Sequence, residues 1–469
     1  VVQLLLANGA DVNPPADKYG TALQGASAGG YNGIVQLLLD NGADVNTPSG
    51  EYGTALQCAS AGGHEQTLQL LLAKGADVNA PACSYGTALQ RASSNGHEVL
   101  VQLLLANGAD VNVPDSEHNG TALQDASTEG HEGVVQVLLA NGADVNATAG
   151  KYGTPLQRAS TEGHEGVVQL LLANGADVNA PADRSGRYGT AIQGASARGY
   201  NEIVQLLLDN GADVNALAGE NGTALQCASA RGREGIVQLL LANGADVNAP
   251  AGRSGSYGTA LQDACRKGYE VVVQLLLANG ADVNAAGDEY GTALQGASAG
   301  GNEGVVQLLL ANGADVNTRG EYGTALQYAS AGGYEGVVQL LLANGADVNP
   351  PADRSSRYGT ALQCASDADH EGVVQLLLAN GADVNTRGEY GTALQYASAG
   401  GYEGVVQLLL ANGADVNAPA DRSGRYGTAL QCASDAGHEG VVQLLSAKGA
   451  VSTPSASRRR TCDIFISWG

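Results

Sequence analysis

The segment Thr324–Asn349, TALQYASAGGYEGVVQLLLANGADVN, decides the fold of this chain because close copies of it recur along the sequence. Successive copies lie 32 to 36 residues apart, and their leading Thr residues are Thr21, Thr54, Thr87, Thr121, Thr154, Thr190, Thr223, Thr259, Thr292, Thr324, Thr360, Thr392 and Thr428. A fixed period in this range is typical of a solenoid, in which one repeat cannot bury its apolar face without its neighbours. The 469 residues therefore predict one elongated array instead of several globular domains.

Each repeat carries the signals of two short helices. Thr324 to Gln327 has the form of a capping box, in which the Thr oxygen accepts from a backbone N–H three residues on and the Gln reaches back. The apolar residues of Val337–Leu342 have the spacing of a helical stripe. Gly345 ends this second helix, since Gly tolerates the left-handed conformation. We therefore expect an all-α fold with two antiparallel helices per repeat. An extended, turn-rich loop, which we call the finger, joins each repeat to the next.

This pattern resembles the ankyrin repeat. The family pattern G-x-T-P-L-H-x-A…G-H…V-x-x-L-L-x-x-G-A-D-x-N maps onto nearly the whole chain, although Gln replaces His in every TPLH-like segment and its Pro survives only at Pro155. The resemblance implies an α-solenoid over residues 1–450, built from a half repeat at 1–13 and about thirteen full repeats. It also implies a non-catalytic scaffold that binds a protein partner through a long concave surface.

A narrower resemblance concerns the repeat variant. YGTALQ-x-AS followed by VVQLLLANGADVN is similar to the C-terminal arrays of fungal NACHT-type, NOD-like receptor proteins. The chain begins within a repeat and contains no Met, so we expect it to be a piece of a longer protein. The alternative function is therefore a sensing or regulatory arm of a larger NACHT-type signalling ATPase, whose nucleotide-binding domain would lie upstream of Val1. No P-loop sequence G-x-x-x-x-G-K-[ST] is present in the chain itself.

The composition argues against nucleic-acid and membrane partners. The formal net charge is −24, and 25 of the 47 acidic residues are the Asp of GADVN or a Glu at the start of the second helix, where the helix dipole favours it. A nucleic-acid binder needs a basic footprint. No apolar run approaches the roughly 18 residues that a membrane span requires. We expect a monomer that binds neither.

The cysteines indicate reduced thiols. Four of the seven hold the same place in non-adjacent repeats, too far apart to bridge: Cys58, Cys227, Cys364 and Cys432. We therefore expect an intracellular, cytoplasmic protein.

Nothing in the sequence predicts catalysis, a metal or a cofactor. Six of the seven histidines hold one position at the start of the second helix, where Tyr, Asn or Arg stands in other repeats: His64, His97, His131, His164, His370 and His438. Interchange with Tyr31 and Asn302 favours a structural role. No CxxC or HxxxH pair suggests zinc.

Two positions vary from repeat to repeat and are where partner specificity could reside: the residue after TALQ and the pair that ends the first helix. The sixth to eighth repeats concentrate basic residues at or near the second position, and the candidate partner-binding residues are Arg184, Arg187, Arg198, Arg231, Arg253, Arg266 and Lys267. Stacked helices about 8 to 10 Å apart would align them into a strip for an acidic protein segment. A merely solvated charged face is the alternative.

Two other features leave alternatives open. A Tyr immediately before the finger Gly, which either packs between fingers or forms an exposed aromatic stripe, recurs as Tyr19, Tyr52, Tyr85, Tyr152, Tyr188, Tyr257, Tyr290, Tyr322, Tyr358, Tyr390 and Tyr426. The tail 451–469 is expected to be poorly ordered. Its alternative role is to cap the last repeat with Ile464, Phe465, Ile466 and Trp468.

Overall fold

The computed structural model describes most of each repeat. The described residues are 1–13, 20–48, 53–81, 86–114, 120–148, 153–181, 189–217, 222–250, 258–286, 291–320, 323–350, 359–388, 391–419 and 427–451. They contain 27 helices and no strand, so the predicted all-α repeat architecture is confirmed. The eleven finger Tyr residues and the tail from 452 onward lie outside the described residues.

The chain forms two compact bodies, each described here by itself. The N-terminal body comprises Val1–Asp246 with Gly252–Ser256. Its first helices are α2 (Ala22–Ala28), α4 (Ala55–Gly62), α6 (Ala88–Ser94), α8 (Ala122–Glu129), α10 (Pro155–Glu162), α12 (Ala191–Arg198) and α14 (Ala224–Ser229). Its second helices are α1 (Val2–Ala7), α3 (Asn32–Asp40), α5 (Glu65–Ala73), α7 (Glu98–Ala106), α9 (Glu132–Ala140), α11 (Glu165–Ala173), α13 (Asn201–Asp209) and α15 (Glu234–Ala242).

The C-terminal body comprises Val247–Ala251 and Tyr257–Gly469. Its first helices are α16 (Ala260–Lys267), α18 (Ala293–Ala299), α20 (Ala325–Ala331), α22 (Ala361–Asp367), α24 (Ala393–Gly400) and α26 (Ala429–Ala436). Its second helices are α17 (Glu270–Ala278), α19 (Glu303–Ala311), α21 (Glu335–Ala343), α23 (Glu371–Ala379), α25 (Glu403–Ala411) and α27 (Glu439–Ala447).

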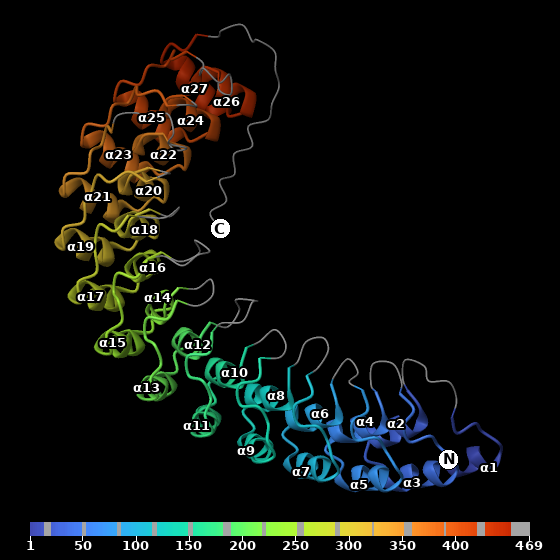
Figure 1. Cartoon of the computed structure of the whole chain (residues 1–469). Coiled ribbons are helices and arrows are strands. Elements are labelled where there is room, and N and C mark those ends of the chain that lie inside the picture. The colour runs from blue at the N-terminus through green and yellow to red at the C-terminus, as the bar shows by residue number, and fades with distance from the viewer. Residues whose placement is uncertain are drawn as a thin grey trace. The chain divides into compact units, whose positions relative to one another are not determined.

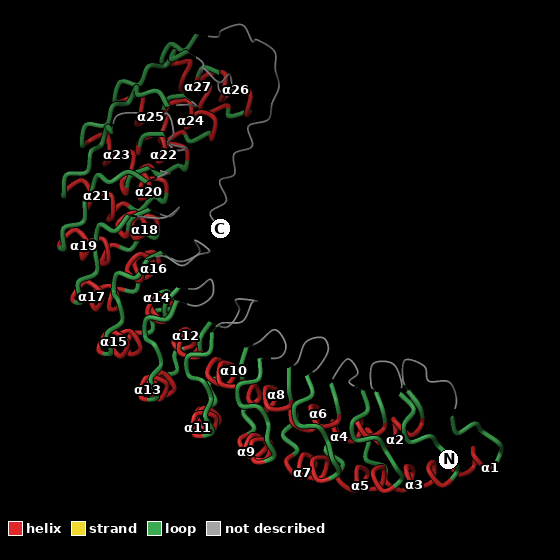
Figure 2. The backbone as a smooth tube through the Cα atoms, in the orientation of Figure 1, coloured by secondary structure: helices red, strands yellow, loops and turns green. Residues whose placement is uncertain are grey.

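Within each body the even-numbered helices form one row and the odd-numbered helices form a second row beside it (Figure 1). Each first helix packs against the second helix of its own repeat and against the first helices of adjacent repeats, as α8 does with α6, α9 and α10. The loops connect helices of one row with helices of the other row (Figure 2). Contacts therefore connect neighbouring repeats, as expected for a solenoid.

The core of a repeat lies between its two helices. In α21, Val337, Val338 and Leu341 are completely buried, and in α20 Leu326 and Ala329 are 1% and 0% exposed. The predicted apolar stripe is thus confirmed. Because every repeat offers a narrow apolar face, its burial depends on the repeats on either side.

The second helices end as the sequence predicts. Gly345 follows α21 with φ +84°, a backbone conformation that suits glycine. At the end of the first helices the same conformation recurs, for example at Gly437 with φ 78°. In the eleventh repeat an aspartate, Asp369, occupies the equivalent position with φ 59°, and it is the one non-glycine residue in the described part of the chain with positive φ. This position is therefore conformationally strained.

A row of asparagines joins the GADVN segments. Asn317 Nδ2 donates to the carbonyl of Gly345 in the next repeat at 3.1 Å, and Asn317 Oδ1 accepts from the backbone N–H of Asp347 at 2.8 Å. The pair Asn385 and Gly413 has the same 3.1 Å separation. Each Asn thus bonds to a donor and an acceptor of the following repeat, and the side chain lies in solvent.

Candidate interaction surface

The first helices from α2 to α24 start with the predicted capping box, and in α26 the Thr428 side chain accepts from the backbone N–H of Gln431. The backbone N–H of Thr121 donates to Gln124 Oε1 at 2.7 Å, and the backbone N–H of Gln124 donates to Thr121 Oγ1 at 3.3 Å. Gln124 is fully buried. These two bonds satisfy backbone donors that an isolated helix start leaves open.

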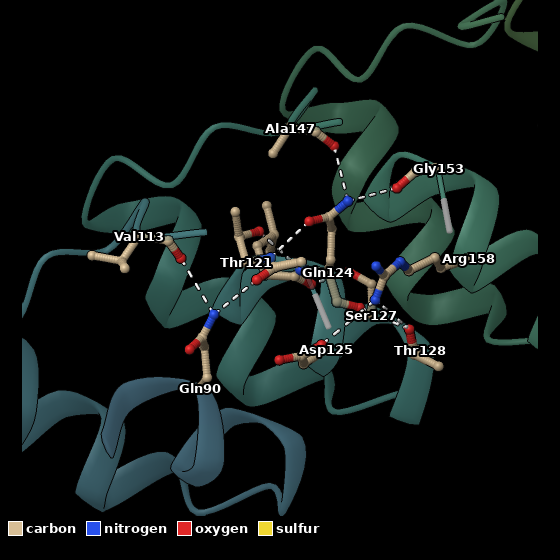
Figure 3. Close-up of polar contacts among 12 residues, drawn as sticks. Gln90, Val113, Thr121, Gln124, Asp125, Ser127, Thr128, Ala147, Gly153 and Arg158 are labelled. Carbon is tan, nitrogen blue, oxygen red and sulfur yellow. Dashed lines mark hydrogen bonds and ion pairs between the residues drawn. The ribbon is translucent and has the colours of Figure 1, made fainter. Parts of the chain in front are cut away.

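The same glutamine also binds the next repeat. Gln124 Nε2 donates to the carbonyl oxygens of Ala147 at 3.2 Å and Gly153 at 2.6 Å (Figure 3). One repeat earlier, Gln90 Nε2 donates to the carbonyl of Val113 at 3.3 Å (Figure 3). The carboxamide therefore caps its own helix with its oxygen and holds the neighbouring finger with its nitrogen. This explains how Gln serves at the position where the family pattern has His.

The histidines have the structural role that the sequence favoured. His164 Nε2 lies 2.8 Å from the carbonyl oxygen of Thr128 in the preceding repeat, to which it donates in the tautomer that carries the proton there. Tyr200 and Asn302 make the equivalent bond in other repeats, to Glu162 O at 3.3 Å and Cys265 O at 3.2 Å. This bond joins two consecutive repeats. His, Tyr and Asn can replace one another at this position because each side chain can donate it.

The residue after TALQ is buried in most repeats, although it is exposed in the first repeat and half-buried at Asp125, Gly194 and Tyr328. Arg158 is 4% exposed and Cys227 2%, and Asp263 is likewise 2% exposed. This position faces the neighbouring first helix, so its variation changes the interface between repeats. In the repeats where this residue is buried, it cannot contribute to partner specificity by direct contact.

One ion pair at this position joins two consecutive repeats. Arg158 Nη1 in α10 lies 3.5 Å from Asp125 Oδ1 in α8 and donates to Thr128 Oγ1 at 3.4 Å (Figure 3). The sequence interpretation overlooked this ion pair. The pair could have been predicted because Asp125 and Arg158 carry opposite charges at the same position of two consecutive repeats.

The pair that ends the first helix does lie at the surface. In the N-terminal body Arg198, the last residue of α12, has 54% of its side chain exposed, and Arg231 just after α14 is also exposed. In the C-terminal body Lys267 is exposed. These three residues meet the first requirement for partner contact.

Arg266 differs from the other candidates. Its Nη2 lies 3.3 Å from Asp263 Oδ1 in the same helix, and only 32% of its side chain is exposed, against 2% for Asp263. Arg266 therefore offsets a buried carboxylate. Reversing its charge would disturb the helix as well as any partner contact.

The seven candidates are divided between the two bodies. Arg198 and Arg231 belong to the N-terminal body, whereas Arg266 and Lys267 belong to the C-terminal body. The finger candidates Arg184, Arg187 and Arg253 lie outside the described residues. The predicted strip through three repeats thus stays a prediction, and each body contains two of its described members.

The described residues offer no other concentration of reactive groups. Among them, no cluster of three or more His, Cys, Asp or Glu side chains is arranged to hold a metal ion. Cys265 and Cys364 are buried. Burial raises the pKa of the Cys265 thiol, and burial together with the charge of Asp367 raises that of Cys364 to about 12. No helix within the described ranges is both long and apolar enough to cross a membrane.

The family model for ankyrin repeats, in its version of three copies, matches overlapping segments that together extend from residue 1 to residue 455. The chain belongs to the ankyrin repeat family. Repeats of this family generally mediate contacts between proteins and are generally not enzymes. The paired helices described above are thus those of an ankyrin array.

Among solved structures, the chain is similar to the human ASB11 ankyrin repeat domain. The two are 28% identical, and the match covers 48% of this ankyrin chain and 96% of the other, with a TM-score of 0.41. A comparison with curated proteins finds no match.

Proposed function

We propose that this ankyrin array is a non-catalytic scaffold that binds an acidic segment of a protein partner, in part through Arg198 and Arg231. The observation that carries the proposal is the contrast between the two variable positions. The residue after TALQ is buried between first helices in most repeats, whereas Glu129, Arg198 and Arg231 at the helix ends are exposed and differ in charge. Variation that reaches solvent without altering the repeat interfaces is what a specific binding surface requires.

The predicted residues in the other segments extend this proposal. Lys267 and Arg266 would add positive charge in the C-terminal body, and Arg184, Arg187 and Arg253 would add it from the fingers. Charged contacts of this kind mainly increase the association rate and fix the orientation of the partner. They weaken with salt, because the Debye length falls to about 8 Å at 0.15 M ionic strength.

The test measures binding of a fluorescent peptide of alternating Glu and Ser at low salt. We expect the double variant Arg198→Glu with Arg231→Glu to bind about tenfold more weakly, since each exposed ion pair contributes up to about 1 kcal/mol and reversal adds repulsion. The control is Arg319→Glu with Arg387→Glu, which reverses two exposed charges outside the candidate set. Equal weakening by both variants, or by neither, would leave only a solvated charged face.

The sensing arm of a NACHT-type signalling ATPase is the second candidate function. The repeat variant YGTALQ-x-AS with VVQLLLANGADVN supports it. Sequencing the transcript upstream of Val1 tests this candidate, because a P-loop should be encoded there. A transcript that encodes only further repeats or a start codon would contradict it.

A further inference from the structure

Four charged residues of the N-terminal body form one row, which we name the charged row: Glu129, Glu162, Arg198 and Arg231. Each occupies the residue before the glycine that follows a first helix, in four consecutive repeats. Their helices α8, α10, α12 and α14 pack against one another in this order. The row therefore presents two negative charges followed by two positive charges along adjacent repeats.

The charged row is accessible. Glu129 and Arg231 are exposed, and the side chains of Glu162 and Arg198 are 32% and 54% exposed. Arg198 Nη2 and Glu162 Oε1 are 4.0 Å apart, where the sign changes. An exposed pair at this limit contributes at most about 1 kcal/mol, so both side chains stay available to a partner.

The glutamates at the start of the neighbouring second helices do not share this reversal, whereas Arg233 adds a positive charge near the positive end of the charged row. Every second helix beside the charged row has a glutamate in its first turn: Glu132 in α9, Glu165 in α11, Glu202 in α13 and Glu234 in α15. This second line is uniformly negative across the four repeats. The negative potential of these glutamates affects two peptides of the same composition nearly equally. It therefore does not distinguish peptides that differ only in the order of their charges.

We propose that the charged row binds an extended segment of a partner in which two basic side chains precede or follow two acidic side chains, with a charge at about every third residue. Packed helices lie about 8 to 10 Å apart, and an extended chain advances about 3.3 Å per residue, so three residues match one repeat. The basic half pairs with Glu129 and Glu162, and the acidic half pairs with Arg198 and Arg231. This inference rests on the proposed function and specifies the order of charges in the partner.

The experiment uses two synthetic peptides of one composition. The block peptide has the charge order Lys-x-x-Lys-x-x-Glu-x-x-Glu, and the alternating peptide has Lys-x-x-Glu-x-x-Lys-x-x-Glu, with neutral residues at x. We expect the natural chain to bind the block peptide about tenfold more tightly in about 0.01 M salt, where screening is weak, because the alternating peptide places two like-charged pairs in contact. The block peptide can pair all four of its charges with opposite charges of the charged row in either chain direction.

A charge swap within the protein gives the matched control. The variant Glu162→Arg with Arg198→Glu makes the charged row alternate, keeps the net charge and keeps an opposite pair at its centre. The preference should therefore invert, with the alternating peptide bound about tenfold more tightly. Equal affinities for the two peptides, or no binding of either at about 1 mM, would overturn the inference.

Two further measurements separate this inference from the proposed function. In the first, the peptide of alternating Glu and Ser is compared with the block peptide on the natural chain and on the double variant Arg198→Glu with Arg231→Glu. If the natural chain binds both peptides equally tightly and the double variant binds the Glu and Ser peptide more weakly, the proposed function stands and the proposed charge order is wrong. Because the order of the row is also complementary to itself when antiparallel, the chain alone is examined by sedimentation. A dimer that the charge swap dissociates would make the occupant a second copy and overturn the peptide proposal.

Discussion

Arg158 and Asp125 join two consecutive repeats by an ion pair in which Nη1 and Oδ1 are 3.5 Å apart and the side chains are only 5% and 13% exposed. Charged side chains at this depth lose most of their hydration. Their mutual attraction offsets that loss only while both are present. The pair therefore makes the fit between α8 and α10 specific to these two repeats.

Replacing Arg158 by Ala should destabilise the N-terminal body by about 3 kcal/mol, because Asp125 then keeps its charge without this partner. Urea unfolding followed by circular dichroism measures the change. The double variant Arg158→Met with Asp125→Leu removes both charges and should recover most of the stability. A double variant as unstable as the single one would show that packing, and not charge pairing, is decisive.

Gln124→Ala should cost about 2 to 4 kcal/mol, since it removes an acceptor for Thr121 and a donor for two carbonyl oxygens of the next repeat. Gln136, exposed on α9, supplies the control, and Gln136→Ala should change stability by less than about 0.5 kcal/mol. Chemical denaturation compares the two. Similar losses from both would contradict the bridging role of Gln124.

Asp369→Gly should raise the stability of the C-terminal body by about 0.5 kcal/mol, because glycine adopts the positive φ of this position with little strain. The reciprocal change, Gly437→Asp, should lower stability by about 1 kcal/mol at the equivalent position two repeats later. An added Cβ at Gly437 meets no atom within 4 Å, so backbone strain dominates. Thermal melting of the two variants should shift in opposite directions.

The Cys364 thiol should resist alkylation by iodoacetamide in the folded protein at pH 8. Burial and the charge of Asp367 raise its pKa to about 12, so only about one thiol in ten thousand is ionised at that pH. Raising the pH should increase the reactive fraction, and unfolding in urea should expose the thiol altogether. Mass spectrometry of the Cys364 peptide measures the rate. Labelling as fast in the folded chain as in urea would refute the burial argument.

The helices of a repeat could be predicted from the sequence because the residues that begin and end them recur from repeat to repeat. The capping pair Thr324 and Gln327 and the terminating Gly345 recur with little change, so the pattern separates structural positions from variable ones. The pattern also placed Arg198 and Arg231 at helix ends, where the structure finds them exposed.

The position after TALQ could not be interpreted in this way. Variable residues on a helix usually face solvent, and Arg158 read alone looks like an exposed charge. Its burial depends on Asp125 in another repeat, a contact that no local pattern contains. The ion pair between Arg266 and Asp263 was likewise not predicted, because the burial of Asp263 depends on the packing between repeats.

The asparagine row has a consequence for how such an array changes its length. Residues 317–349 and 385–417 are identical, and Asn317 and Asn385 bond to the following repeat in the same way. An unequal crossover between these two copies adds or deletes two whole repeats and leaves a donor and an acceptor in place at the new junction. Recombination can thus lengthen the array without compensating substitutions, except where it would separate Asp125 from Arg158.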